Sequence, residues 1–341
     1  MRSRTRLLVG LAAAAALALT ALTAGGAAAT APNGHANATS APPKIGLVTD
    51  IGGLNDRSFN HLAYLGLTEA HAKLGVPIRV LESHSNADYV PNMASLAQQG
   101  YSLVIAVGFL MHAAVRQVAK SFPNTKFMII DDAWAKGDPK NLEGTVFHEE
   151  QAGYMVGYLA GLLEKGSKTI SSVGGQKIPP VDHYIAGYMA GAKAANPDIT
   201  VLNGYSQDFV AQDKCKNLAL QQIGQGSKVV FQVAGGCGLG ALDAAKQKHV
   251  WVIGVDADQS FLGAYILTSA VKRVDVDVYT TIAQLRNGIF KSARTFQFKV
   301  SNGGIDIGKI SSKVPKADVA KVLAIKNKIK HNKLHIPNTV P

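Results

Sequence analysis

The sequence predicts an α/β protein in which two doubly wound, parallel-sheet lobes are joined by a hinge. From residue 44 onward, short β-branched runs alternate with longer segments of helical periodicity. The short runs are continuously apolar, as expected of parallel strands covered on both faces. The alternation restarts after a helix at 149–166 in which glycine recurs every fourth residue, so one lobe should follow another.

Ten strands are expected along the chain. They are 44–50, 77–83, 102–108, 126–131 and 143–148 in the first set and 168–175, 199–205, 228–236, 250–256 and 264–272 in the second. The segments between them have helical patterns, as in 89–100, where Pro91 suits a first turn and Gly100 a helix end. The 341 residues, 47% of them apolar, are enough for two substantial cores.

The N-terminus has the features of an export signal. Three arginines precede an apolar run over 7–24, and the small residues after it offer A-x-A cleavage sites. Because the run approaches the length that spans a bilayer, a retained membrane anchor is the alternative. Both interpretations place the rest of the chain outside the cytoplasm, and no later run is apolar enough to span a membrane.

The chain has two cysteines, Cys215 and Cys237. In an exported protein an even count favours one disulfide, and two free thiols are the alternative. Two cysteines are too few for a structural zinc site. Because no metal-ligand spacing stands out elsewhere either, no metal and no cofactor are expected.

Positive charge is concentrated late in the chain. The formal charge is +12, or +9 without the three N-terminal arginines, and eight lysines between Lys309 and Lys333 face one acid, Asp318. A solvated basic face is the simplest interpretation, and contact with anionic lipid or a cell-wall polymer is the alternative. No aromatic residues interleave for base stacking, so no nucleic-acid partner is expected.

Acidic, aromatic and basic side chains stand at the carboxyl ends of the expected strands, where open parallel sheets bind ligands. Each has a structural explanation as a helix cap, a core residue or a surface charge, but their convergence on one crevice favours a binding site. The candidates are Asp50, Phe59, Asp131 with Asp132, Phe231, Asp256 and Lys272.

These side chains suit a ligand with flat rings and hydroxyl groups. An aromatic pair can hold a π-face, and each contact contributes roughly 0.5–1.5 kcal/mol beyond its buried area. Carboxylates can accept hydrogen bonds from ring nitrogens and vicinal hydroxyls. The glycine-rich segment 234–240 could form an anion nest, but the nearby aspartates would repel a phosphate.

Five ordered motifs resemble the basic membrane protein family, the nucleoside-binding receptors of ABC importers that include the purine nucleoside receptor lipoproteins. The motifs are VTDIGGLNDRSFN, FMIIDD, FQVAGGCGLG, WVIGVDADQ and LTSAVKR. The resemblance implies a type I periplasmic binding protein, with three crossover strands and a ligand held at the hinge. The implied segments are a signal and linker at 1–40, an N-terminal lobe of 41–148 plus about 257–292, a C-terminal lobe of 149–256 plus about 293–332, and a tail at 333–341.

The resemblance also implies that the strand ends form a nucleoside pocket. Its two stacking rings are expected to be Phe59 and Phe231. The residues expected around the base are Asp50, Asn55 and Asp131, and those expected around the ribose are Asp256, Lys272, Gly235 and Gly236.

The function implied is that of an extracytoplasmic solute-binding protein, a monomer and not an enzyme, that captures a nucleoside, with a purine favoured, and delivers it to an ABC permease. Unlike many family members, the chain has no lipobox cysteine, so a periplasmic, a secreted and a cell-surface location all stay open. The cysteine pair also departs from the family pattern. A disulfide beside Gly236 would stiffen one pocket wall and lower the ordering cost of binding.

Three other functions stay open from the residues. A protein of this fold could bind a sugar or another small metabolite, or act as a sensory receptor for a membrane kinase. Nucleoside hydrolysis is a third, because VTDIGGLND superficially resembles the acidic segment of calcium-dependent nucleoside hydrolases. Asp50 and Asp56 are, however, more widely spaced than a tight calcium-binding aspartate cluster.

Overall fold

The computed structural model describes residues 41–166 and 168–341. The expected signal and linker at 1–40 lie outside the described residues. Residues 41–341 form one compact unit. None of the helices in the described ranges has both the length and the apolar character needed to cross a bilayer.

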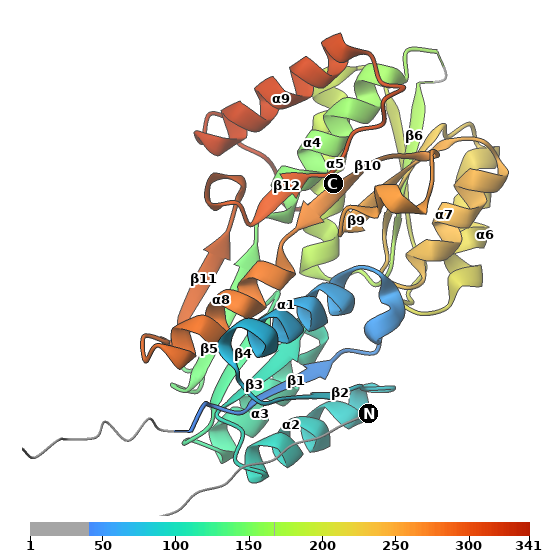
Figure 1. The fold of residues 1–341 in the computed structure, drawn as a ribbon. Helices are drawn as coiled ribbons and strands as arrows, with labels where there is room; N and C mark the ends of the chain where they lie inside the picture. Colours follow the sequence, from blue (N-terminus) through green and yellow to red (C-terminus); the bar gives the residue numbers. More distant parts are fainter. Residues whose placement is uncertain (1–40, 167) are drawn as a thin grey trace, which may run out of the picture. The chain divides into compact units, whose positions relative to one another are not determined.

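The first sheet has the strand order β11-β5-β4-β3-β1-β2, and every neighbouring pair is parallel (Figure 1). Helices α1 and α8 pack against each other on one face, and α2 and α3 cover the other. The elements are β1 (Ile45–Thr49), α1 (Phe59–Leu74), β2 (Ile78–Leu81), α2 (Tyr89–Gln98), β3 (Leu103–Val107), α3 (His112–Ser121), β4 (Lys126–Ile130), β5 (Leu142–Phe147), α8 (Val274–Arg286) and β11 (Arg294–Phe298).

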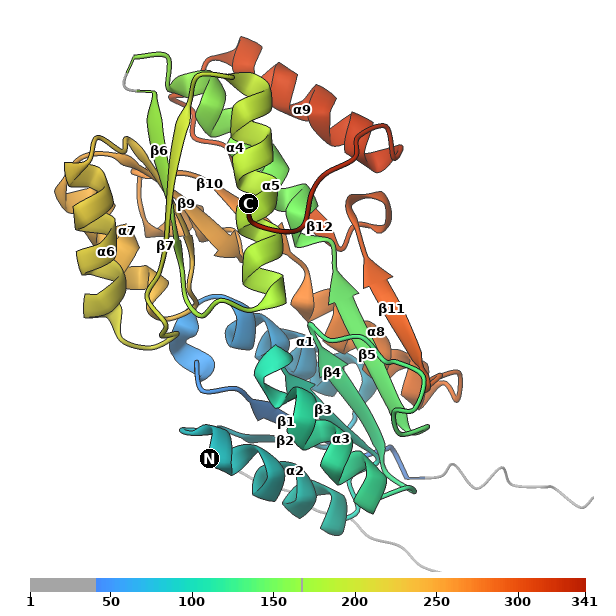
Figure 2. The same ribbon diagram turned by 180° about the vertical axis from the view of Figure 1, so that it is seen from behind.

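The second sheet has the order β12-β10-β9-β8-β6-β7, and its edge strand β12 runs antiparallel to β10. Helices α4 and α5 cover one face, α6 and α7 cover the other, and α9 lies on α4 (Figure 2). The elements are α4 (Glu149–Leu163), β6 (Thr169–Gly174), α5 (Pro179–Ala195), β7 (Thr200–Tyr205), α6 (Gln212–Gly224), β8 (Val229–Val233), α7 (Gly238–Gln247), β9 (Trp251–Asp256), β10 (Ile266–Lys272), β12 (Ile305–Ile307) and α9 (Lys316–Lys330).

The predicted fold class is confirmed: strands and helices alternate in two doubly wound layers. All ten expected strands are present. The central ones are apolar runs buried between helix layers, whereas β2 and β7 are half-buried edge strands. Strands β11 and β12 were not expected, since β11 is largely exposed and β12 is only three residues long.

The chain crosses between the two sheets three times, at His148, Arg273 and Lys299. Strand β10 pairs with β9 in the second sheet, and β11 pairs with β5 in the first. The lobe boundaries predicted near 257 and 293 placed these two segments in the opposite lobes and are wrong at those points. A strand belongs to the lobe whose strands it pairs with, and the sequence of one strand does not show which strand that is.

Helices α4 and α5 approach each other closely on their shared face of the second sheet. A Cβ atom on Gly153 or Gly157 of α4 would lie 2.1 Å from the backbone carbonyl oxygen of Tyr184 or Tyr188. The fourfold glycine spacing noted in the sequence therefore serves this helix contact. It places Tyr184 of α5 beside the carboxyl ends of the strands.

Candidate ligand-binding site

A cavity lies between the carboxyl ends of the two sheets. Its empty volume is about 570 Å³, including the part open to solvent. Asp50 and Gly108 border it where the strand order of the first sheet reverses, between β1 and β3. The lining comprises Asp50, Gly52, Asp56, Phe59, Asn60, Gly108, Phe109, Leu110, Asp131, Ile178, Pro180, Val181, Tyr184, Phe209, Val233, Ala234, Gly235, Val255, Asp256 and Lys272.

The segment between β1 and α1 supplies one wall. The Asp50 carboxylate accepts hydrogen bonds from the Gly52 N–H at 2.8 Å and from Asn60 Nδ2 at 2.7 Å. The Asp56 carboxylate accepts from three backbone N–H groups at the start of α1, at 2.8 to 3.1 Å, and so caps that helix. Burial raises the pKa of both carboxyls, that of Asp50 to about 6, although these hydrogen bonds oppose the rise.

Lys272 places a buried ammonium at the cavity, with 2% of its side chain exposed. Its Nζ lies 2.7 and 2.9 Å from the two carboxylate oxygens of Asp131 and 3.2 Å from Glu149 Oε1. The same atom lies 4.8 Å from the centre of the Phe59 ring. Because Lys272 ends β10 of the second sheet and Asp131 follows β4 of the first, this ion pair joins the two lobes.

The charges in this group depend on one another. Burial opposes the charged form of Lys272, but the carboxylates of Asp131, Glu149 and Asp256 outweigh that effect and raise its pKa. Burial raises the pKa of Asp131 to about 7 against the attraction of Lys272. Burial also acts on Glu149, but Lys272 and His183, whose Nδ1 lies 3.1 Å from Glu149 Oε2, hold its pKa below the usual range. The Lys272 ammonium is therefore the shared cation of two buried carboxylates, those of Asp131 and Glu149.

Asp256, the last residue of β9, forms the second polar link between the lobes. Ser58 Oγ, at the start of α1, donates to its carboxylate at 2.7 Å, and Tyr184 Oη donates at 3.1 Å. Burial raises the pKa of Asp256 despite the opposing charge of Lys272. Asp256 has a φ of 60° and Asp131 a φ of 68°, so both strand-end acids adopt the left-handed conformation that most side chains avoid.

Phe59 lines the cavity, as predicted, but Phe231 does not. Phe231 lies in the middle of β8, is completely buried, and packs against Tyr184 and Tyr188 with ring centroids 6.0 and 5.0 Å away. The prediction that it lines the pocket is wrong, because its side chain points onto helix α5 and not past the end of the strand. Phe231 therefore packs against Tyr184, which itself lines the cavity.

Two other phenylalanines line the cavity and were not predicted: Phe109, which follows β3 in the first lobe, and Phe209. Phe209 is the one from the second lobe. It lies between β7 and α6, and its carbonyl oxygen accepts a hydrogen bond from the Cys237 N–H at 2.9 Å. A Cβ atom on Gly175 would lie 2.3 Å from the ring, so a glycine is required there. The sequence signal for Phe209 is its position four residues after the carboxyl end of β7.

Asn55 and Gly236 are the other predicted site residues that do not line the cavity. Asn55 lies in a short 3-10 helix (Leu54–Asp56) and is exposed, whereas its neighbour Asp56 turns inward. Gly236 is buried directly behind the lining residue Gly235. The glycine-rich turn before α1 sets which of the two adjacent polar residues faces inward, and the order of residue types does not reveal it.

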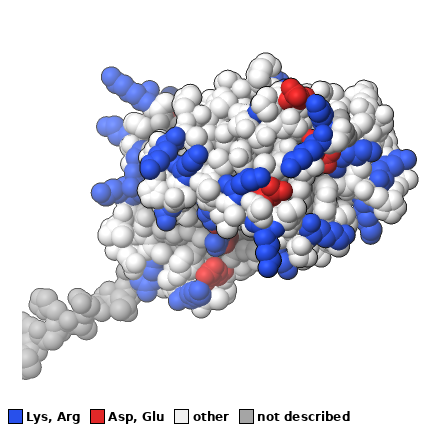
Figure 3. Space-filling view, turned by 90° about the horizontal axis from the view of Figure 1, so that it is seen from above, with Lys and Arg blue, Asp and Glu red and all other residues white. Residues whose placement is uncertain are grey.

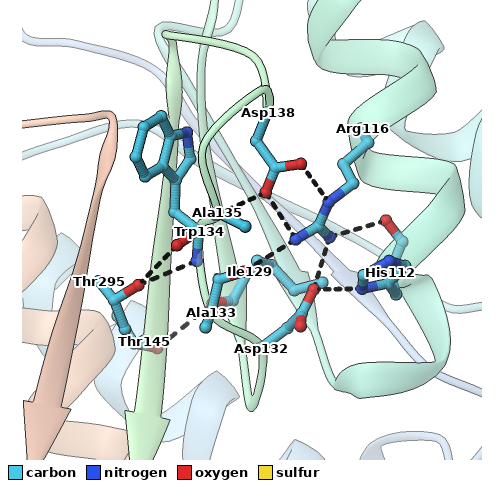
Figure 4. Close-up of polar contacts among 10 residues, drawn as sticks. All are labelled: His112, Arg116, Ile129, Asp132, Ala133, Trp134, Ala135, Asp138, Thr145 and Thr295. Carbon is cyan, nitrogen blue, oxygen red and sulfur yellow. Dashed lines mark hydrogen bonds and ion pairs between the residues drawn. The ribbon is translucent and has the colours of Figure 1, made fainter.

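Polar contacts fix the loop that follows Asp131, and Figure 4 shows those of Asp132, Arg116 and Asp138. The neighbouring Asp132 points away from the cavity, and its carboxylate accepts from Arg116 Nη1 at 2.5 Å and pairs with His112 Nδ1 at 2.8 Å. Arg116 also forms a two-pronged contact with Asp138, at 2.8 and 2.9 Å, across the same loop. Both acids of the FMIIDD motif are thus accounted for: Asp131 borders the cavity, and Asp132 anchors the loop.

Cys215 and Cys237 form a disulfide, as predicted, with their Cα atoms 5.6 Å apart. Cys215 lies in the first turn of α6, and Cys237 directly precedes α7. The bridge therefore joins the starts of two helices that follow the Phe209 loop and Gly235.

Among the described residues, one group of three has the spacing of metal ligands: Glu149, Glu150 and His183, whose candidate ligand atoms lie within 4.8 Å of one another. Glu149 already contacts Lys272 and His183, and Glu150 Oε1 lies 2.8 Å from His148 Nδ1. The cation that pairs with Glu149 is the Lys272 ammonium, and both carboxylates of this group form contacts at the crossover between the lobes.

Two sheets, three crossovers and a cavity at their facing strand ends define the type I periplasmic binding protein fold. A solved ABC transporter solute-binding protein from Aeropyrum pernix superposes with a TM-score of 0.81 at 24% identity, covering 88% of this chain and 94% of that one.

The chain belongs to the family of PnrA-like ABC transporter substrate-binding proteins, whose model matches residues 44–340. It is 34% identical to the ABC transporter nucleoside-binding protein BmpA of Lactococcus lactis, over 78% of this chain and 81% of that protein. It is 31% identical to the CD4+ T-cell-stimulating antigen of Listeria monocytogenes, over 86% and 87% of the two chains. The family resemblance predicted from the five motifs is confirmed, and family members bind solutes for ABC transporters.

Proposed function

We propose that this protein captures a nucleoside, with a purine favoured, between its lobes outside the cytoplasm and delivers it as a monomer to an ABC permease. The observation that carries the proposal is the composition of the cavity. Three phenylalanines border it, Phe59 and Phe109 from the first lobe and Phe209 from the second, together with four aspartates and one lysine that is already paired.

The aromatic side chains support a ligand with a flat ring. Phe59 comes from the first lobe and Phe209 from the second, so a ring bound between the lobes can contact both. Each such contact contributes roughly 0.5–1.5 kcal/mol beyond the buried area. Both contacts form together only when the lobes are closed, so the ring favours the closed state.

The charges support a neutral ligand that is rich in hydrogen-bond donors. Asp50, Asp56, Asp131 and Asp256 line the cavity, and Lys272 is held by Asp131 and Glu149. Carboxylates accept hydrogen bonds from hydroxyl and ring N–H groups, whereas a phosphate beside them would be repelled. A nucleoside therefore fits this cavity better than a nucleotide. The printed name of the Lactococcus lactis relative points to the same ligand class.

Closure supports delivery to a membrane partner. Ser58 with Asp256 and Lys272 with Asp131 already link the lobes at hydrogen-bond distance. A ligand can shift the lobes toward this state only by binding it more tightly than the open state. The mechanism is non-covalent: the loaded, closed form is the species that the permease recognises.

The test is calorimetric titration of residues 41–341, after removal of co-purified ligand, with adenosine, guanosine, inosine, cytidine, uridine, adenosine monophosphate and ribose. Tight binding of one nucleoside, at least tenfold weaker binding of the monophosphate, and loss of affinity in Phe209→Ala and Asp256→Asn are expected. Phe261→Ala is the matched control, because Phe261 is 67% exposed and does not line the cavity.

Binding of ribose alone, or of no nucleoside, would replace the proposal with a receptor for a sugar or another small metabolite. Incubation with inosine and calcium tests the hydrolase alternative, because release of free ribose would contradict a purely binding function.

A further inference from the structure

Helix α9 has an inner face that belongs to the core. Val322, Ile325 and Ile329 are buried at helical spacing, and the helix packs against α4. This contact fixes which side of α9 faces solvent.

The opposite side of α9 has a short apolar strip bordered by lysines. Ala320, Leu323 and Ala324 form this strip and are exposed, with Leu323 at 50%, and the polar Asn327 lies on the same side one turn further on. On the helical pattern, lysines flank the strip along both of its edges. We call this surface the lysine face, and it comprises Ala320, Leu323, Ala324, Lys316, Lys321, Lys326, Lys328 and Lys330.

Most of this charge is not neutralised locally. Lys321 pairs with Asp318, and Lys326 pairs with Asp306. Lys316, Lys328 and Lys330 have no ion pair within the part of the chain that the structure describes. Figure 3 looks down on the side where α9 is uppermost in Figure 1, and lysine and arginine side chains clearly outnumber acidic ones there.

We propose that the lysine face docks on the surface of an anionic phospholipid bilayer. Lysines bordering an apolar strip match the two attractions at such a surface, the negative headgroups and the headgroup–acyl boundary. A nucleic acid fits less well, because residues 309–341 contain no arginine to bind phosphate or guanine in two places and no phenylalanine, tyrosine or tryptophan to stack on bases. Lysine is a flexible point charge, which suits a fluid and diffuse layer of charge.

Docking by this face leaves ligand capture undisturbed. None of its residues lines the cavity or belongs to the links between the lobes. The proposal therefore stands or falls independently of the ligand. It assigns to α9 the task of keeping the receptor close to the membrane.

The experiment is co-sedimentation of residues 41–341, a compact unit without the N-terminal apolar run, with phosphatidylcholine vesicles that contain or lack an equal part of phosphatidylglycerol. Binding only to the anionic vesicles, weakening as salt rises, is expected. Each lysine near such a surface contributes about fivefold. The triple variant Lys316→Gln, Lys328→Gln, Lys330→Gln should therefore bind on the order of 100-fold more weakly.

The matched control carries Lys120→Gln, Lys136→Gln and Lys140→Gln, three exposed lysines of the first lobe that also lack ion pairs in the described ranges. Equal weakening in both triple variants would overturn the proposal, because net charge alone would then explain binding. A second pattern would also overturn it. In that pattern the protein does not bind the vesicles, but it binds soluble polyphosphate or RNA, and the α9 triple variant binds them equally well.

Leu323→Ser tests the apolar strip without altering charge. It should weaken vesicle binding several-fold, whereas Leu65→Ser, at a leucine of α1 that is 43% exposed, should not. Melting temperatures within the error of the parent confirm that both serine variants are folded. An unchanged affinity of Leu323→Ser together with an unchanged α9 triple would exclude α9 as the docking surface.

Discussion

At the scale of single residues, the cavity depends on buried charges that hold one another in place. Lys272 compensates Asp131 and Glu149, and the backbone at Asp131 and Asp256 is held in the left-handed region. Such strain persists only where neighbouring contacts fix it, as they do here through Ser58 and Lys272.

Replacing Lys272 by methionine should lower the free energy of unfolding by about 3–5 kcal/mol, because it leaves two buried carboxylates without their cation. Urea unfolding measures the change. Lys248→Met, at an exposed lysine, should have little effect. Adding Asp131→Asn to the Lys272→Met protein should recover part of the loss, and no recovery would contradict the assigned charge balance.

The pKa of Asp50 predicts a specific pH dependence. Its folded-state pKa of about 6 lies above the ordinary 3.8, so the folded protein holds this proton more tightly than the unfolded chain. Asp50 therefore lowers stability as pH rises from 3.8 to about 6, by about 3 kcal/mol in total. Relative to the parent, Asp50→Asn should gain stability across this interval, as measured by urea unfolding at stepped pH. A constant difference between the two proteins would refute the shift.

At the scale of elements, two loops aim the cavity residues. The loop after β4 is fastened by Arg116, and the loop carrying Phe209 is fastened at its far side by the Cys215–Cys237 bridge. Both loops follow strand ends, where the sheet no longer constrains the chain.

Replacing Arg116 by glutamine should loosen the loop at 132–138. Two buried or half-buried carboxylates, those of Asp132 and Asp138, would lose their shared cation. Amide hydrogen exchange should accelerate at least tenfold in this loop, and nucleoside affinity should fall with it. Arg286→Gln, at an exposed position of α8, is the control. Unaltered exchange in the loop would mean that Arg116 does not hold it.

Replacing both cysteines by serine should cost on the order of 3 kcal/mol of unfolding free energy, because the bridge closes a loop with a sequence separation of 22 residues. Ligand affinity should also fall, since the Cys237 N–H that holds Phe209 becomes less well placed. The affinity is measured where both proteins are folded. Equal affinities would show that the bridge serves stability alone.

At the scale of the whole compact unit, closure rests on few polar contacts. Ser58 Oγ donates to Asp256 and to the Val255 carbonyl oxygen, and Gln259 Nε2 donates to the Arg57 carbonyl oxygen. These residues belong to different lobes, so the contacts break when the lobes part.

Ser58→Ala should therefore shift the ligand-free protein toward an open state, visible as a larger radius of gyration in small-angle scattering. A saturating nucleoside should restore the smaller radius, because the ligand binds the closed state more tightly. Ser312→Ala, at an exposed serine before α9, should scatter like the parent. No change in Ser58→Ala would mean that this hydroxyl does not hold the lobes together.

The sequence predicts part of the cavity lining. Asp50, Asp131, Asp256 and Lys272 border the cavity as predicted, because they directly follow or end buried apolar strands. Phe231, Asn55 and Gly236 do not border it. Phe231 is buried in the middle of its strand, Asn55 lies in a short turn that faces outward, and Gly236 is covered by Gly235. These properties arise only when the chain is packed. The ligand-binding roles of the lining residues stay predictions.

The sequence by itself determined the alternation of strands and helices, the fold class, the family and the acidic character of the strand ends, because apolar runs and ordered motifs are local properties of the chain. Only the tertiary structure decided which lobe holds β10 and β11, that Phe209 and not Phe231 borders the cavity, and that Lys272 meets Asp131 across the lobes. Those outcomes depend on strand pairing and side-chain direction. Contacts between residues far apart in the chain set both.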